Sequence, residues 1–335
     1  MAAYDRLSQK KVMRMWRSKT LTVLMSVSAF CAQAQEYPTK PIRMIVPFAP
    51  GGPNDVLGRI VAQKMSEQMG QQVIIDNRSG AGGGTGTVAV SVAPPDGYTL
   101  LFSGTSSLAI NPSLYKVPYD PLKDFAPIGL AGTAPSLLAT HPSVPARSIS
   151  DLIVLAKAKS ARLNYASGGI GGTPHLAAEL FKTIAQIQME HVPFRGAAPA
   201  LTALASGEVD VYIGGITSVL QLANAGRIRA IAVTSARRTQ LMPQMPTFIE
   251  SGVAGYEIVN WYAMVAPAAT PASVIKRLNA ELVKALATPD VTKRFADLGT
   301  DAISSTPEQL GAYHRQELAK WAKLIKASGI NVSGT

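Results

Sequence analysis

The chain has 335 residues, of which 47% are hydrophobic and 16% charged. This length and this apolar content exclude a disordered chain and are typical of an α/β protein of about two domains with buried strands. Aromatic residues make up only 6%, so the sequence offers no broad stacking platform for nucleic acid, although the formal net charge is +11.

Residues 1–34 are predicted to be an export signal. A basic stretch ending at Lys19 precedes a mostly apolar run at 21–32, which is too short to span a bilayer. The triplet Ala-Gln-Ala at 32–34 supplies a small-x-small cleavage site, so we expect the mature chain to begin at Gln35. The alternative is an amphipathic N-terminal helix of a cytoplasmic protein, which does not require this three-part order.

Removal of the signal changes the charge and the cysteine content. Residues 1–34 hold six basic residues and one acidic residue, so the net charge falls from +11 to +6. The remaining charge is spread along the chain, which suits attraction of an anion better than nucleic-acid binding. The single cysteine, Cys31, lies in the signal and follows Phe30. Because a lipoprotein signal needs a small residue there, we expect a soluble periplasmic product without disulfides.

Short β-rich runs alternate with helical patterns along the mature chain. The intervals predict right-handed βαβ units and mainly parallel sheets flanked by helices. Prolines mark several helix starts, at Pro53 (with the helix running to about Met69), after Thr173, at Pro271 and after Thr306. The predicted strands are 42–48, 72–77, 99–104, 163–168, 189–194, 209–215 and 228–235.

Two extended segments, 129–142 and 256–271, are long for single strands. We interpret them as strands that cross between two lobes. Lobe 1 would then comprise 35–135 plus 262–335, and lobe 2 would comprise 136–261.

Several common sites are excluded by their missing motifs. The glycine-rich segment 79–86 lacks the lysine of a phosphate loop, and its glycines do not follow the dinucleotide spacing, so we read it as a flexible loop before a helix. The four histidines form no His-Glu-x-x-His helix, and there is no Gly-x-Ser-x-Gly elbow. We therefore expect no catalytic residue, no metal and no cofactor.

Four strand-to-helix junctions carry small or hydroxyl residues, at 47–55, 103–107, 166–175 and 213–218. In an open parallel sheet, ligands bind beyond the carboxyl ends of the strands, where helix N-termini present free N–H groups. Glycine lets the backbone approach an anion closely, and Ser or Thr adds donors without a charge. These junctions predict one shared carboxylate site.

Long ordered motifs now point to a family. They include PIRMIVPFAPGGPNDVLGR, INPSLYKVPYDPLKDFAPI, LNYASGGIGGTPHLAAELF and HVPFRGAAPALTALASGEVDV. With these motifs the chain resembles the Bug family, the TctC-like substrate-binding proteins of tripartite tricarboxylate transporters. The resemblance implies a two-lobed periplasmic-binding-protein fold, with two sheets joined by two crossing strands, that closes on a carboxylated solute like a Venus flytrap.

The resemblance also implies a set of ligand-binding residues. Asp55 is expected to cap the first helix instead of touching solute. The implied contacts are Phe48, Pro50, Gly51 and Gly52 in the first loop, Ser103, Thr105, Ser106 and Ser107 in the next, and Ser167, Gly168, Gly169, Thr173, His175, Arg195 and Gly215 in lobe 2.

One departure from the family bears on the ligand. Many relatives have Phe-Asp-Asn after the Val-Asp-Val strand, whereas this chain has Ile213-Gly214-Gly215. Without that carboxylate an ammonium group would lack a counter-charge, which argues against an amino-acid ligand. The lost side chain also makes room, and with Trp261 and Tyr262 near the implied cleft an aromatic dicarboxylate would fit, unless these aromatics belong to the core.

These inferences give the expected function. The protein captures a small organic carboxylate in the periplasm, as a monomer without chemistry of its own, and delivers it to integral-membrane transporter subunits. The alternative is a periplasmic sensor that passes the same signal to a membrane kinase. Nucleic acid is not an expected partner.

Overall fold

The structure is a computed structural model that describes residues 37–158, 162–194, 196–239 and 241–329. The expected signal at 1–34 therefore lies outside the described residues, as does Arg195. Residues Lys40–Thr335 form one compact unit, which holds all helices and strands among the described residues.

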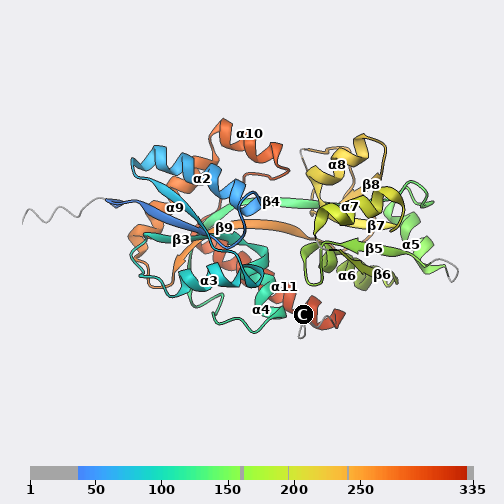
Figure 1. Cartoon of the computed structure of the whole chain (residues 1–335), viewed down its shortest axis with the longest axis horizontal. Helices are drawn as coiled ribbons and strands as arrows, with labels where there is room; N and C mark the ends of the chain where they lie inside the picture. Colours follow the sequence, from blue (N-terminus) through green and yellow to red (C-terminus); the bar gives the residue numbers. More distant parts are fainter. Residues whose placement is uncertain (1–36, 159–161, 195, 240, 330–335) are drawn as a thin grey trace, which may run out of the picture. The chain divides into compact units, whose positions relative to one another are not determined.

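Three parallel strands begin the fold (Figure 1). β1 (Ile42–Val46) lies between β2 (Val73–Asn77) and β3 (Thr99–Gly104). The connecting helices are α2 (Pro53–Met69) and α3 (Gly84–Ser91). α2 starts with proline and ends before a glycine in the left-handed conformation, with φ 65°, which is the usual asymmetry of helix ends.

Two long antiparallel strands join this group to the rest of the sheet. β4 (Phe125–Thr140) and β9 (Val259–Pro267) pair with each other over most of the length of β9 (Figure 1). β9 also pairs with β3, while the end of β4 pairs with β7 (Val211–Gly215) and β8 (Arg229–Val233). These are the strands that the sequence predicted to cross between lobes.

A second parallel group follows β4. β5 (Asn164–Ser167) lies between β6 (Glu190–Pro193) and β7. The strand order is β2-β1-β3-β9-β4-β7-β5-β6, with β8 on β4. Helices α6 (Thr173–Ala185), α7 (Ala197–Ser206) and α8 (Ile216–Asn224) follow β5, β6 and β7 in turn, so their N-termini stand at the carboxyl ends of those strands.

The other helical elements lie between the strands or follow β9. They are η1 (Ala81–Gly83, 3-10), η2 (Thr105–Ile110, π-helical), α4 (Asn111–Leu114), α5 (Ile149–Lys157), α9 (Ala272–Leu286), α10 (Pro289–Asp297) and α11 (Pro307–Ser328).

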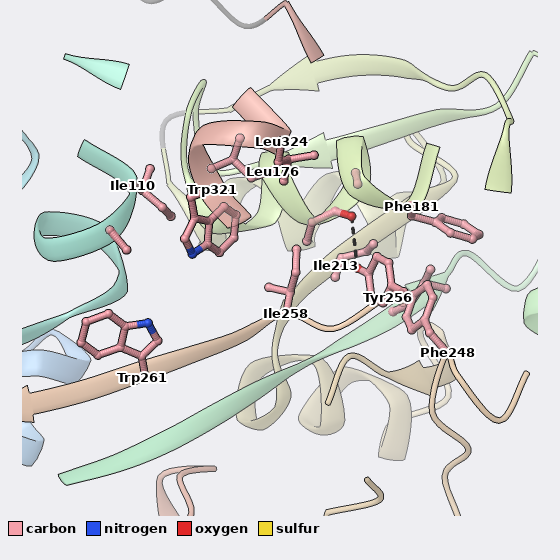
Figure 2. Close-up of a cluster of buried hydrophobic side chains, with 14 of the residues drawn as sticks. Ile110, Leu176, Phe181, Ile213, Phe248, Tyr256, Ile258, Trp261, Trp321 and Leu324 are labelled. Atoms are coloured by element: carbon pink, nitrogen blue, oxygen red, sulfur yellow. Dashed lines mark hydrogen bonds between the residues drawn. The ribbon is translucent and has the colours of Figure 1, made fainter. Parts of the chain in front are cut away.

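One extensive hydrophobic cluster of the described residues takes side chains from both strand groups. Figure 2 shows Trp321 and Leu324 of α11 beside Leu176 of α6 and Ile110 of η2. The Tyr256 hydroxyl within this cluster donates to the Ala177 carbonyl at 3.1 Å. The C-terminal helix therefore packs against elements of both groups, which couples them through buried apolar surface.

The predicted fold class is confirmed: two mainly parallel strand groups, flanked by helices, are joined by two crossing strands. All seven predicted short strands are present, with ends within two residues of those expected. The exact lobe boundaries, 35–135 plus 262–335 against 136–261, stay a prediction. The glycine-rich segment differs from the expected loop, because η1 occupies its middle and α3 already begins at Gly84.

Two absences concern the described residues only. No helix there is long and apolar enough to cross a membrane. No group of three His, Cys, Asp or Glu side chains in the same part of the chain is placed to hold a metal ion.

Candidate ligand-binding site

The first predicted ligand loop connects β1 to α2. Phe48 in this loop is half-buried, while Pro50 and Gly51 are exposed. Gly51 has φ 85°, a left-handed conformation that favours glycine. Its N–H donates to Asp55 Oδ2 at 2.8 Å. The Gly51 amide therefore binds the protein's own carboxylate, so in this conformation it does not make the solute contact that the sequence predicted.

Asp55 holds this loop in place. It is buried and accepts hydrogen bonds from Arg59 Nε at 3.1 Å and Asn77 Nδ2 at 2.9 Å. Asn77 Nδ2 also donates to the Phe48 carbonyl at 3.1 Å. Burial by itself would raise the pKa of Asp55, but the hydrogen bonds from Arg59, Gly51 and Asn77 outweigh it and lower the pKa below its usual value. Asp55 is thus an ionised support for the loop. The expected helix cap is not formed, because the N-cap residue is Gly52 without a side-chain cap bond, and Asp55 binds the Gly51 N–H ahead of the helix.

Asn54 is a neighbour that the sequence did not single out. It stands in the first turn of α2, and its Oδ1 atom is buried without a hydrogen-bond partner among the described residues. The N–H groups of a first helical turn lack intrahelical acceptors as well. This end of α2 therefore combines unused donors with an unused acceptor.

The second predicted loop, after β3, is more buried than expected. Ser103 and Ser107 are fully buried and their hydroxyl oxygens lie 2.6 Å apart. Thr105 is also buried, and its Oγ1 accepts from the backbone N–H of Trp261 at 2.8 Å. Ser106 is half-buried. Three of the four predicted hydroxyls thus have partners inside the protein, and Ser106 is the one with a partly open side chain.

The first two loops come together around Gly83. A Cβ atom at Gly83 would lie 3.0 Å from the Phe48 ring and 3.3 Å from Ser107 Cβ. Phe48 and Ser107 therefore both lie next to one glycine of η1. The absence of a side chain at Gly83, which has φ 99°, is what allows this approach.

The predicted loop between β5 and α6 is held from inside. Ser167 is fully buried, and its Oγ donates to the Gly169 carbonyl and accepts from the Gly169 N–H, both at 3.1 Å. Gly168 and Gly169 are half-buried. Thr173 is buried at the start of α6 and donates to Asn260 Oδ1 at 3.0 Å.

His175, predicted as a ligand contact, is buried within the protein. Its Nδ1 accepts from the Gly171 N–H at 3.0 Å, and its ring stacks on His191 with centroids 4.0 Å apart. Burial lowers the pKa of His175 below its usual value. These contacts indicate that His175 shapes the loop. His191 itself was not predicted from the sequence.

Asn260 and Trp261 are neighbours on β9, and each is hydrogen-bonded to the first residue of a helical element. Thr173 of α6 binds Asn260, and Thr105 of η2 binds Trp261. The second loop and the β5–α6 loop are therefore tied to consecutive residues of one crossing strand. This arrangement brings predicted residues from both strand groups to the same short stretch of β9.

The predicted aromatic lining separates into two cases. Trp261 is buried, and its Nε1 donates to Glu317 Oε2 of α11 at 3.1 Å, so it belongs to the core. Tyr262 is also largely buried, and burial raises its pKa to about 12. Phe48, on the first loop, remains as a half-buried aromatic side chain.

Gly215 is exposed at the junction of β7 and α8, where it is the N-cap residue. A Cβ atom there would have only Ser218 Oγ nearby, at 3.9 Å. Gly214 is different, because a Cβ atom would lie 2.2 Å from the Tyr212 ring. An acidic side chain can therefore be accommodated at 215 and not at 214.

Comparison with known proteins identifies the family of the chain. A match to the family described as "Tripartite tricarboxylate transporter family receptor" covers residues 57–330. Among curated proteins, the chain is 40% identical over 93% of its length to the "UPF0065 protein in tcbD-tcbE intergenic region" of Pseudomonas sp. (strain P51), covering 94% of that protein. It is 35% identical over 88% of its length to BugT of Bordetella pertussis, covering 91% of BugT.

Solved structures show the same fold. A protein from R. palustris, solved with adipate, has 35% identity and a TM-score of 0.76, over 88% of this chain and 99% of that one. MatC from Rhodopseudomonas palustris, solved with malate, has 30% identity and a TM-score of 0.71, over 86% and 100%. With its fold, its ordered strand-to-helix loops and these matches, the chain belongs to the tripartite tricarboxylate transporter receptor family, and its resemblance to the Bug proteins is confirmed.

Proposed function

We propose that this protein is a periplasmic solute-binding protein that captures a small organic carboxylate for a tripartite tricarboxylate-type transporter. The observation that carries this proposal is the attachment of Thr105 and Thr173 to consecutive residues of β9. It places the starts of η2 and α6 near each other, and the half-positive start of the 13-residue α6 suits an anion.

The comparisons support the ligand class. Relatives that share the fold and about a third of the sequence were solved with adipate and with malate, which are both dicarboxylates. A dicarboxylate would place one carboxylate at the Phe48–Gly52 loop and the other at the Ser167–Thr173 loop. Each strand group then supplies half of the contacts, so binding favours closure of the two lobes.

The Ile213-Gly214-Gly215 segment narrows the class further. With Gly214 in place of the aspartate and Gly215 in place of the asparagine that many relatives carry, the end of β7 offers no acidic side chain to meet an ammonium group. We therefore favour acids without an amino group, and the space at Gly215 leaves room for a bulky or aromatic one.

A thermal-shift screen tests the proposal. The purified chain is heated with aliphatic and aromatic mono-, di- and tricarboxylates, adipate and malate among them, and with amides of matched shape as controls. We expect a dicarboxylate to raise the melting temperature while its diamide has no effect. Stabilisation by neutral or cationic solutes alone would overturn the carboxylate assignment.

The partner and the absence of chemistry need separate measurements. Co-purification with membrane transporter subunits is expected, whereas recovery of a sensor kinase would favour the signalling alternative. The bound acid should be recovered chemically unchanged after prolonged incubation. Small-angle scattering should show a smaller radius of gyration with a stabilising acid than without it.

A further inference from the structure

The two ends of the β5–α6 loop are each fixed by a histidine. At the first end, Ser167 Oγ lies 2.7 Å from His191 Nε2 and also contacts both backbone groups of Gly169. At the other end, the Gly171 N–H donates to His175 Nδ1 at 3.0 Å. The loop thus contacts two imidazoles, one on β6 and one on α6.

The hydrogen-bond pattern fixes the protonation of His175 Nδ1 and leaves one assignment that satisfies every contact of Ser167. His175 Nδ1 accepts a hydrogen bond and therefore carries no proton, so His175 is neutral. The Ser167 hydroxyl has one donor and two acceptor positions. We assign its proton to the Gly169 carbonyl, so that its lone pairs accept from the Gly169 N–H and from His191 Nε2–H. In this assignment all three contacts of Ser167 are satisfied together.

The two rings are packed against each other and against a tyrosine. The His175 and His191 rings are within 9° of parallel, and the Tyr165 ring lies 4.9 Å from that of His191. Tyr165 Oη donates to Glu179 Oε1 at 2.6 Å, and Lys182 pairs with the same oxygen at 2.6 Å. Tyr165 of β5 and Glu179 and Lys182 of α6 are thus the titratable groups that surround the pair.

We propose that His191, with His175 stacked on it, is a positioning residue that holds the Ser167–Thr173 loop in the conformation that receives a carboxylate. The effect of His191 on solute affinity rests on the proposed function. Its effect on the order of the loop in the solute-free protein does not. His191 acts through Ser167 and does not itself touch the solute.

Two variants separate the hydrogen bond from the ring. His191→Phe keeps a flat ring for stacking and removes the Nε2–H donor. His191→Gln loses the ring but keeps an N–H donor at a similar distance from the backbone. A matched control is His141→Phe, because His141 Nδ1 lies 2.7 Å from Ser143 Oγ in the loop that directly follows β4.

Hydrogen exchange of residues 167–173 in the solute-free protein is the primary measurement. We expect His191→Phe to speed exchange of the Gly169 and Gly171 amides about tenfold, and His191→Gln to restore most of the protection. The His141→Phe control should leave these amides unchanged. The adipate or malate affinity of His191→Phe should fall by about the same factor.

The outcomes distinguish this inference from the proposed function. If neither adipate, malate nor any other acid of the screen binds the wild type, the proposed function fails, while the exchange experiment still decides the inference. Unchanged exchange of Gly169 and Gly171 in a folded His191→Phe protein overturns the inference. If His191→Phe does not fold, His191→Gln decides, because loss of protection despite a retained donor would also overturn it.

Discussion

The Trp261 indole donates a hydrogen bond to the Glu317 carboxylate at 3.1 Å, which joins the crossing strand β9 to the C-terminal helix α11. The same carboxylate oxygen, Oε2, accepts a second hydrogen bond, from the Trp321 indole at 3.0 Å. Lys320 forms an ion pair with the other oxygen. Glu317 is buried, so a single carboxylate satisfies two indole N–H groups in the interior.

Replacing Glu317 with leucine should destabilise the protein. The change leaves the indole N–H groups of Trp261 and Trp321 buried without an acceptor. We expect a loss of about 2–4 kcal/mol in the free energy of unfolding. Glu317→Gln should cost less, because the amide oxygen still accepts from one indole. Urea unfolding followed by tryptophan fluorescence measures both.

The neighbouring Gln316 provides a control, since it is exposed on the same helix. Gln316→Leu should change the free energy of unfolding by no more than about 0.5 kcal/mol. Equal stabilities of Glu317→Leu and Gln316→Leu would show that the buried carboxylate contributes nothing net.

The parts of the fold that follow from local sequence pattern were predictable. Runs such as 99–104 and 228–235 carry β-branched and apolar residues between turn signals, and prolines such as Pro53 mark helix starts. The crossing strands could be inferred from their length. Their register could not, because it depends on pairing between segments more than 120 residues apart.

The site was less predictable, because side-chain partners are set by tertiary contacts. The sequence shows that Ser103, Thr105 and Ser107 carry hydroxyl groups. It does not show that these hydroxyls are already hydrogen-bonded to buried neighbours. Trp261 faces Glu317 in the core. The sequence could not show this, because alternation along a strand gives two faces without telling which one is the core. For His191, its place in a predicted strand beside the β5–α6 loop was the only available signal.

The first-loop glycines should respond differently to valine. Gly52 has φ −77°, and a Cβ atom there would meet nothing closer than the Ala49 carbonyl oxygen at 3.6 Å, so Gly52→Val should fold. It should still weaken adipate or malate binding by tenfold or more, because two methyl groups would stand where a carboxylate approaches the start of α2. Calorimetry and a melting curve on the same sample measure the two effects.

Gly51→Val is a less clean change, because the φ of 85° is strained for valine and the Gly51–Asp55 bond would be disturbed. We expect it to lower stability as well as affinity. Full affinity in a folded Gly52→Val protein would place this loop outside the site.

The stability of the fold should depend on pH through His191. Burial, followed by the repulsion that would arise if the stacked His175 and His191 rings were both protonated, lowers the pKa of His191 from 6.5 to about 4. Between these values the unfolded chain binds a proton at His191 and the folded chain does not, so stability falls as the pH falls from 6.5 toward 4 and is fully present above 6.5.

His191→Phe should flatten this part of the stability curve. Urea unfolding of the wild type and the variant at pH 7.5, 6.5, 5.5 and 4.5 gives the comparison. The difference in unfolding free energy between the two proteins should move in favour of the variant at low pH. A constant difference across this range would mean that His191 takes up a proton equally in both states.

The last prediction concerns the ligand class. Gly215 is the N-cap of α8 and has room for a side chain. Aspartate is a better N-cap than glycine, so Gly215→Asp should fold and melt no lower than the wild type. Its carboxylate would stand at the predicted site and repel a bound dicarboxylate, by several kcal/mol where water is excluded and by less in a wet site. We therefore expect weaker adipate or malate binding and a gain for amino acids such as aspartate.

Gly214→Asp is the matched contrast. A side chain there would collide with the Tyr212 ring, so this variant should lose stability before any question of ligand arises. Calorimetry of the wild type and Gly215→Asp with dicarboxylic acids and their 2-amino derivatives gives the result. Unaltered affinity for every acid in a folded Gly215→Asp protein would place the start of α8 away from the solute, and the missing aspartate would then say nothing about which acid this protein binds.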